Sequence, residues 1–201
     1  FTGSVTTHTG TVTISDAATT DITATDITTI NTAATGNITA TNAIDLNGSG
    51  SEVAAAVTAI NTHSGATTAN ITGNDYTAAH LKTINDGISG AIVIATPTAT
   101  LEDSAADLVD AFAGSVTTHT GQITITDAPT VAQLKTINAA TSGAIVLGTH
   151  DGALTGDAAD IVLALAGSIT THTGTVTIDD DGTTDVNATD ITTINTKATG
   201  T

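Results

Sequence analysis

Residues 130–143 have the sequence TVAQLKTINAATSG, which carries the signals of a complete short helix. The side-chain oxygen of Thr130 can accept a hydrogen bond from a free N–H of the first helical turn, and Gln133 stands where a side chain can bond back to the cap. Leu134 and Ile137 are three residues apart and therefore share one helical face. The segment predicts a short helix that begins after Thr130 and ends before the final glycine.

The same helix signal occurs seven times, about 27 residues apart, with a small polar residue four places before an aliphatic one. Six of the seven sites also carry an acidic or amide side chain three residues after the cap, which is typical of a capping box or of a carboxylate at the positive helix end. The seven predicted caps are Thr23, Ser49, Thr77, Ser104, Thr130, Asp157 and Asn187.

These caps predict that residues 1–201 form a single repeat array with coil starts near residues 23, 49, 77, 104, 130, 157 and 187. Two kinds of coil alternate, which gives a super-repeat of about 54 residues. One kind resembles residues 130–143, and the other has an Ala-rich helix followed by the turn Thr-Thr-His-Thr-Gly, as in residues 158–174. Both ends of the chain fall inside a repeat, so we expect a segment of something longer.

Asparagine recurs directly after the apolar pair of the first kind of helix. At this place, close to a predicted helix end, asparagine often adopts a turn or left-handed conformation, and we expect that conformation here. The four residues concerned are Asn31, Asn85, Asn138 and Asn195.

Short β-branched or alternating stretches follow the helices and predict strands. The clearest are residues 11–14, 92–94, 122–125, 145–147 and 175–178. One helix and one strand per coil implies parallel strands joined by right-handed crossovers. The predicted fold is therefore an α/β right-handed solenoid with one short helix and one parallel strand in each coil of about 27 residues. The high Thr and Val content leaves an all-β parallel β-helix open as the alternative.

The charge of the chain excludes several kinds of partner. Lys and Arg total 3 against 20 acidic residues, and the formal net charge is −17. Such a chain repels phosphate backbones and anionic lipid heads, so we expect no nucleic-acid binding. No apolar run approaches the length that a membrane span needs, so we expect no membrane insertion. Cys and Met are both absent, which suits a long-lived protein outside the cell or at its surface.

Four histidines recur at one loop position and raise the question of a zinc site. Strands of a solenoid lie about 4.8 Å apart, so histidines two coils apart are about 10 Å from each other. Zinc–nitrogen bonds need about 2.0–2.1 Å, so neighbouring histidines cannot share an ion. We expect turn histidines that bond to backbone groups. They are His8, His63, His119 and His172.

The densest acidic loop is residues 179–185, with the sequence DDDGTTD. Carboxylates at alternating positions around a glycine can surround Ca²⁺, which takes six to eight oxygen ligands. The spacing does not match an EF-hand loop, and a solvated acidic turn stays open as the simpler interpretation. The hypothesis is a calcium site made by Asp179, Asp181 and Asp185.

Other functions have weaker signals. Outward Thr-x-Thr pairs at residues 11–13 and 175–177 are similar to ice-binding faces, but the alternate strands interrupt the pattern. No nucleophile elbow, phosphate loop or metal-binding His pair on a helix is found, so we expect no enzyme activity and no organic cofactor.

Residues 130–145 and 170–178, with the sequences TVAQLKTINAATSGAI and TTHTGTVTI, resemble the repeat arrays of very large cell-surface, adhesin-like proteins of marine cyanobacteria. The resemblance covers essentially the whole chain and implies an extracellular structural or adhesive role. We therefore expect a structural segment of a surface fibre, filament or adhesin stalk, whose partners are neighbouring repeats or like chains. The alternatives are a module that binds glycan, mineral or ice, and a calcium-binding repeat.

Overall fold

The computed structural model describes residues 7–182 and 185–200, and in this part the chain is an α/β protein. The helices are α1 (Ala24–Ala33), α2 (Gly50–Ala59), α3 (Ala78–Gly87), α4 (Ala105–Ala111), α5 (Val131–Ala140), α6 (Ala158–Ala164) and α7 (Ala188–Lys197). The strands are β1 (Val12–Ile14), β2 (Asp21–Thr23), β3 (Ile38–Ala40), β4 (Asp45–Gly48), β5 (Thr68–Ile71), β6 (Ile92–Ile94), β7 (Leu101–Asp103), β8 (Ile123–Ile125), β9 (Ile145–Leu147), β10 (Leu154–Gly156) and β11 (Val176–Ile178).

Every one of these helices begins at the residue directly after a predicted cap, so the seven predicted helix starts are confirmed. Ser49 and Thr130 form complete capping boxes with Glu52 and Gln133. The bonds that the Glu52 carboxylate receives from the Ser49 backbone and side chain hold the pKa of Glu52 below its usual value. Side-chain cap bonds are also made by Thr77, Ser104 and Asn187, but not by Thr23 or Asp157.

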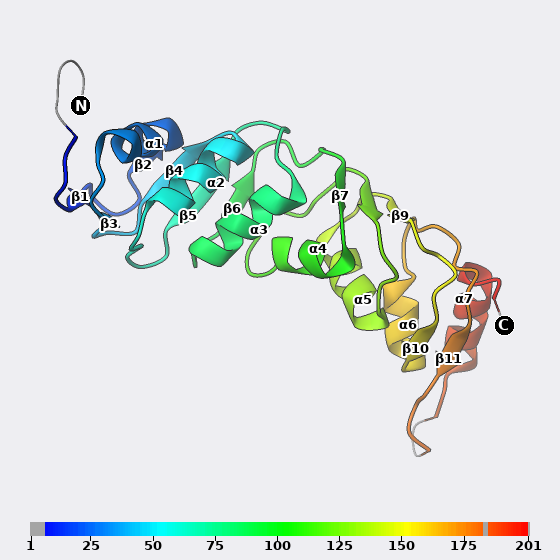
Figure 1. Ribbon diagram of the computed structural model, residues 1–201. Coiled ribbons are helices and arrows are strands. Elements are labelled where there is room, and N and C mark those ends of the chain that lie inside the picture. Colours follow the sequence, from blue (N-terminus) through cyan, green and yellow to red (C-terminus); the bar gives the residue numbers. More distant parts are fainter. Residues whose placement is uncertain (1–6, 183–184, 201) are drawn as a thin grey trace. The chain divides into compact units, whose positions relative to one another are not determined.

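The chain divides into two compact units. The first unit comprises Phe1–Ala99 and Ala111–Thr117. Its strands pair in parallel as β1–β3 and as β2–β4–β5–β6, and α1, α2 and α3 pack in succession beside them (Figure 1). One register row contains Leu46, Ala69 and Ile92, whose side chains are buried under the helices. Parallel strands covered by apolar helix faces form the core of this unit.

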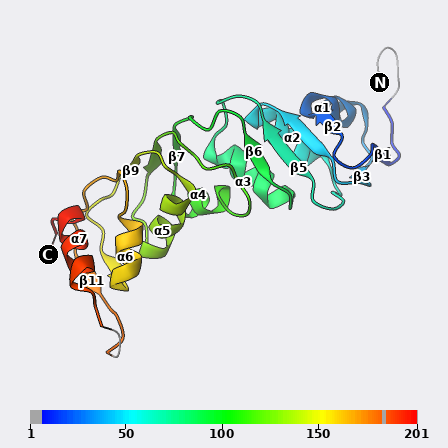
Figure 2. The same ribbon diagram turned by 180° about the vertical axis from the view of Figure 1, so that it is seen from behind.

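The second unit comprises Thr100–Asp110 and Thr118–Thr201. Its parallel ladders are β7–β8–β9 and β10–β11, and α5, α6 and α7 pack in succession, as the view from behind also shows (Figure 2). Ile123 and Ile145 are paired and buried, and Leu134 and Ile161 bring the buried faces of α5 and α6 to the same core.

Two expectations about the elements are wrong. Several coils carry two short strands instead of one: β3 and β4 both lie between α1 and α2, and β9 and β10 both lie between α5 and α6. In these coils the extended segment after the helix and the one before the next helix pair separately: β3 with β1, β4 with β2 and β5, β9 with β8, and β10 with β11. The all-β alternative is also wrong, because helices occupy the segments after all seven caps.

The expected turn conformation of the recurring asparagines is wrong as well. Each of them lies inside a helix, close to its end. Positive φ angles are found instead at Gly114 (69°) and Gly167 (67°), which follow α4 and α6. Glycine adopts this left-handed conformation without a Cβ penalty, which allows the turn that follows each of these two helices.

Candidate functional site

The Thr-Thr-His-Thr-Gly turn is the most regularly recurring candidate site, and its histidine joins two coils through the backbone. The His119 N–H donates to Ala140 O at 3.0 Å, and the Ser142 N–H donates to His119 O at 2.8 Å. The histidine therefore bridges to the end of the following helix, α5. Equivalent bonds join His8 to Ala33 and Thr35, and His172 to Lys197 and Thr199.

The rings of these histidines have different surroundings. His119 and His172 are buried, whereas His8 is exposed. His63 is half-buried, and its Nε2 lies 3.2 Å from Val57 O of α2. These histidines thus lie in turns and bond to backbone groups, His8, His119 and His172 through their own backbone, as expected of turn histidines.

The fold changes the titration of His172. Burial of the ring lowers the pKa of His172, and the nearby His150 acts in the same direction. Backbone hydrogen bonds at Thr175 and Gly152 and the charge of Asp151 oppose this shift in the pKa. The ring is therefore held as neutral imidazole at neutral pH.

Glycines allow successive turns to lie directly on one another. A Cβ on Gly143 would overlap the carbonyl oxygen of Gly121, and one on Gly200 would overlap that of Gly174. Only a residue without a side chain permits such a close approach between backbones. The same overlap would arise at Gly36 over Gly10, at Gly90 over Thr67 and at Gly174 over Gly152.

Two aspartates cap helices of the preceding coil. Asp127 Oδ1 accepts a hydrogen bond from the Ala105 N–H at 2.7 Å, and Asp180 Oδ2 accepts one from the Ala158 N–H at 2.9 Å. These N–H groups open α4 and α6, where a carboxylate also meets the positive end of the helix dipole. Sequence reasoning missed this role, because it searched for caps next to each helix.

The proposed calcium ligands lie on the surface. Asp179, Asp181 and Asp185 are exposed, and the Asp179 N–H donates to Gly156 O at 3.2 Å. Within residues 7–182 and 185–200, no three His, Asp or Glu side chains are grouped closely enough to hold a metal ion. The loop also contains residues 183–184, which lie outside the described residues, and the calcium site stays a prediction.

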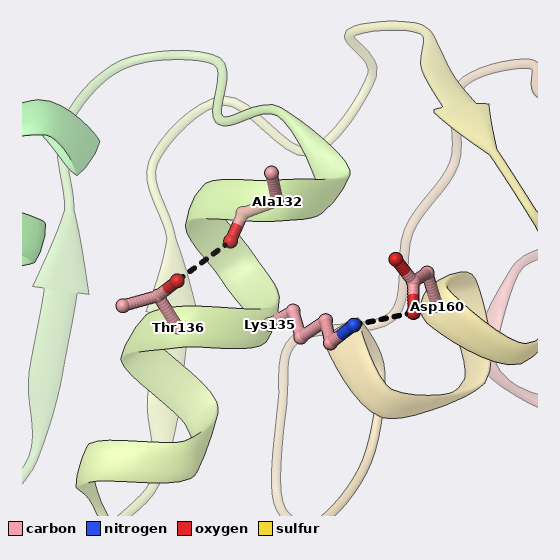
Figure 3. A network of polar contacts seen from close by, with 4 residues as sticks. All are labelled: Ala132, Lys135, Thr136 and Asp160. Atoms are coloured by element: carbon pink, nitrogen blue, oxygen red, sulfur yellow. Dashed lines mark hydrogen bonds and ion pairs between the residues drawn. The ribbon is translucent and has the colours of Figure 1, made fainter.

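Helices α5 and α6 are joined by polar side chains. Lys135 Nζ lies 2.5 Å from Asp160 Oδ1, and both side chains are about two-fifths exposed (Figure 3). Asn138 Nδ2 donates to Leu163 O at 2.7 Å and to Ala166 O at 3.2 Å, which completes the carbonyl end of α6. The polar side chains of this pair of helices thus bond one coil to the next.

The outward face of the strands carries an interrupted threonine pattern. Thr13 pairs with Thr39 across β1 and β3, and Thr155 pairs with Thr177 across β10 and β11. Elsewhere threonine stands opposite other residues, as Thr124 of β8 does opposite the half-buried Val146 of β9. The face offers pairs of hydroxyl groups without a continuous threonine array.

The described parts of the chain carry open grooves, of which three are considered. One of 370 Å³ is bordered by β1, β2 and α1 and carries Asp16, Asp21 and Asp26. One of 250 Å³ lies at Lys135 and Leu163, between α5 and α6. The third, of 160 Å³, is lined by β11 and α7. None of the histidines borders them.

Among the described helices, none has the length and apolar character needed to cross a membrane. Comparison of the chain with protein-family models, with curated proteins and with solved structures gave no match.

Proposed function

We propose that this chain is a structural repeat segment of an extracellular surface fibre, filament or adhesin stalk, built as a right-handed α/β solenoid. The observation that carries the proposal is the recurrence of the same contacts between successive coils. Within each unit, a turn histidine bonds to the end of the following helix, and a glycine lies on the backbone of the preceding turn. Repetition of one contact sets length and stiffness, which are the properties that a fibre needs.

A general rule of chain topology supports the proposed handedness of the solenoid, and the composition of the chain supports the proposed role. Parallel strands joined by helices take right-handed crossovers in nearly all proteins, which supports the right-handed solenoid. A net charge of −17 keeps a long array soluble, and the absence of Cys and Met supports an extracellular location. The resemblance to cell-surface repeat proteins of marine cyanobacteria supports the same role. In this proposal, the partners are neighbouring repeats or like chains, and the chain has no catalytic function.

Immunogold electron microscopy of the source cells or particles, with an antibody raised against this chain, tests the proposal. We expect gold particles at many points along thin filaments or stalks. Label confined to an isolated globular tip would favour the binding module instead, and label inside the cells would contradict the proposal.

The threonine pairs Thr13–Thr39 and Thr155–Thr177 are the observation that favours a surface-binding module as the second candidate. An ice-recrystallisation assay and a glycan array with the purified chain test it directly. The matched control is the double variant T13V/T155V, which removes one hydroxyl from each pair. Equal results for the two proteins would remove the threonine pairs from the account.

Calorimetry tests the calcium-binding repeat. We expect heat of Ca²⁺ binding that is lost in the triple variant D179N/D181N/D185N and retained in D151N, which changes an exposed aspartate outside the acidic loop. Absence of both heat and a calcium-dependent melting shift in the unaltered chain would remove the calcium site.

A further inference from the structure

The threonines of the first unit fall into two groups that differ in what their hydroxyl groups bond to. In α1 the Thr29 hydroxyl donates to Thr25 O at 2.8 Å, and the Thr32 hydroxyl donates to Thr28 O at 3.0 Å. Such hydroxyls are bonded within their own helix. Four threonines outside the helices make no side-chain hydrogen bond to another residue of the described part of the chain, namely Thr11, Thr13, Thr39 and Thr62.

Parallel pairing places three of these four threonines in one row. Thr13 of β1 stands opposite Thr39 of β3, and an isolated parallel bridge joins Thr39 to Thr62, which follows α2 (Figure 1). The Ala40 N–H donates to Thr62 O at 2.9 Å and so fixes the third position of the row. Because paired strands lie about 4.8 Å apart, the three side chains follow one another at about that spacing.

The row lies on the outer face of the coils. Ile38 and Ala40, which flank the middle threonine of the row, are fully buried, whereas Thr13 and Thr62 are exposed. Side chains alternate between the two faces of a strand, so Thr11 shares the outer face with Thr13, about 6.7 Å away along β1. Paired backbone and a buried inner face therefore hold these hydroxyls in a fixed, two-dimensional pattern.

This outer face carries no charge, although the net charge of the chain is −17. Residues 11–15, 37–41 and 60–62 include no acidic, basic or aromatic residue, and their outer side is here called the threonine face. A face without charge complements an uncharged surface and gives a charged partner no electrostatic gain. The absence of an aromatic side chain also leaves nothing on which a sugar ring can stack, which favours water over a polysaccharide as the partner.

We propose that the threonine face binds the surface of ice. A threonine hydroxyl can donate to and accept from water of the lattice, and the methyl group beside it restricts the orientation of neighbouring water. The spacings of about 4.8 Å across the strands and about 6.7 Å along them are close to the repeats of the prism face of hexagonal ice. A pattern held by paired backbone loses little freedom on binding. The proposal rests on the surface-binding candidate and names its partner, and it does not depend on the fibre role.

Adsorption of the purified full chain to slowly growing ice tests the proposal. We expect the unaltered chain to be enriched in the ice fraction relative to the remaining liquid. The variant T13K/T62K, which places two long charged side chains at exposed positions of the threonine face, is expected to lose this enrichment. The matched control T29K/T58K makes the same change of charge at two exposed threonines of α1 and α2, and is expected to keep it. Circular dichroism verifies that both variants are folded.

Exclusion of the unaltered chain from ice would overturn the proposal, and so would equal enrichment of T13K/T62K and the unaltered chain. A second arm measures binding to crystalline cellulose and chitin. Binding there that is lost in T13K/T62K, without adsorption to ice, would also overturn the proposal in favour of a polysaccharide. Immunogold labelling tests the fibre role by the location of the chain, so failure of one proposal is distinguishable from failure of the other.

Discussion

Helices α5 and α6 satisfy the backbone hydrogen-bonding groups at their ends in different ways. Helix α5 satisfies its own N-terminus, because Thr130 and Gln133 form a capping box with groups of the same segment. Helix α6 follows Asp157, whose side chain makes no cap bond. The Asp180 carboxylate of the following coil completes its N-terminus, and Asn138 of α5 completes its carbonyl end.

The comparison teaches that the ends of a helix in this chain can be completed by hydrogen bonds from neighbouring coils. A helix of 7 residues such as α6 is too short to be stable by itself. Its ends are held by side chains that lie 22 residues after Ala158 and 25 residues before Leu163. In the proposed solenoid, stability is a sum of coil terms and of terms between neighbouring coils.

We expect the largest loss of stability from a substitution that pushes apart two turns of neighbouring coils. In G174A the new Cβ would overlap backbone atoms of Gly152 and Asp151. We expect a loss of about 3 kcal/mol in the free energy of unfolding, measured by urea denaturation. The control is G182A, because a Cβ there meets nothing within 4 Å. Equal stability of G174A and the unaltered chain would contradict the close stacking of turns.

The next largest effect is expected when the cap that the following coil supplies to α6 is removed. We expect D180A to lose about 1–2 kcal/mol, because the Ala158 N–H loses its acceptor at the helix start. D157A is expected to cost less, since Asp157 makes no cap bond. D179A, which removes an exposed carboxylate of the same loop, is the control. If D157A were the more damaging variant in urea denaturation, α6 would depend on its own segment after all.

Removal of the amide at the other end of α6 has a smaller expected effect. We expect N138A to lose about 1 kcal/mol, because Leu163 O and Ala166 O lose a donor. T136A is the control: the Thr136 hydroxyl bonds to Ala132 O within α5 itself (Figure 3), and its loss is expected to leave thermal stability nearly unchanged. A melting temperature of N138A equal to that of T136A would contradict the link between α5 and α6.

Acid is expected to weaken the turn that joins α6 to α7. The pKa of His172 is lowered in the folded chain from its usual 6.5, so the unfolded chain binds the proton first. The stability that neutral His172 contributes is present above pH 6.5 and is lost as the pH falls from 6.5 through the lowered pKa. We expect the melting temperature to fall less over this range in H172Q than in the unaltered chain. H8Q, at an exposed histidine, is expected to behave like the unaltered chain.

The smallest effect concerns the ion pair between α5 and α6. Lys135 and Asp160 are both about two-fifths exposed, so the pair contributes under about 1 kcal/mol and is screened by salt. We expect the difference in melting temperature between K135M and the unaltered chain to shrink from low salt to 1 M NaCl. An undiminished difference at high salt would indicate that the Lys135 stem acts through packing.

The starts of the helices could be predicted from the sequence because the cap residue, its acidic or amide partner and the apolar pair lie within a few residues of one another. The bonds from Asp127 and Asp180 could not be predicted in this way, since each reaches an N–H 22 residues earlier in the chain. A recurring signal was available: an aspartate stands two residues after the last isoleucine of the strand in residues 14–16, 125–127 and 178–180.

The sequence pattern also could not predict that the extended stretch between two helices is divided into two short strands. Strands of three residues, such as β9 and β10, are too short for an alternation of period two to show. The recurring asparagines were misplaced because turn preferences describe only the local backbone, whereas the side chains of Asn85 and Asn138 donate to carbonyl groups of the next coil. The need for Gly143 and Gly200 was also beyond the local pattern, because it is the backbone of the preceding turn that leaves no room for a side chain there.

Hydrogen exchange in D180A tests most directly whether neighbouring coils complete each helix. The account predicts that the amides of Ala158–Ala164 lose protection, although the substitution lies in another coil, while those of the self-capped α5 keep theirs. Unchanged protection of α6, or an equal loss in α5 and α6, would contradict it.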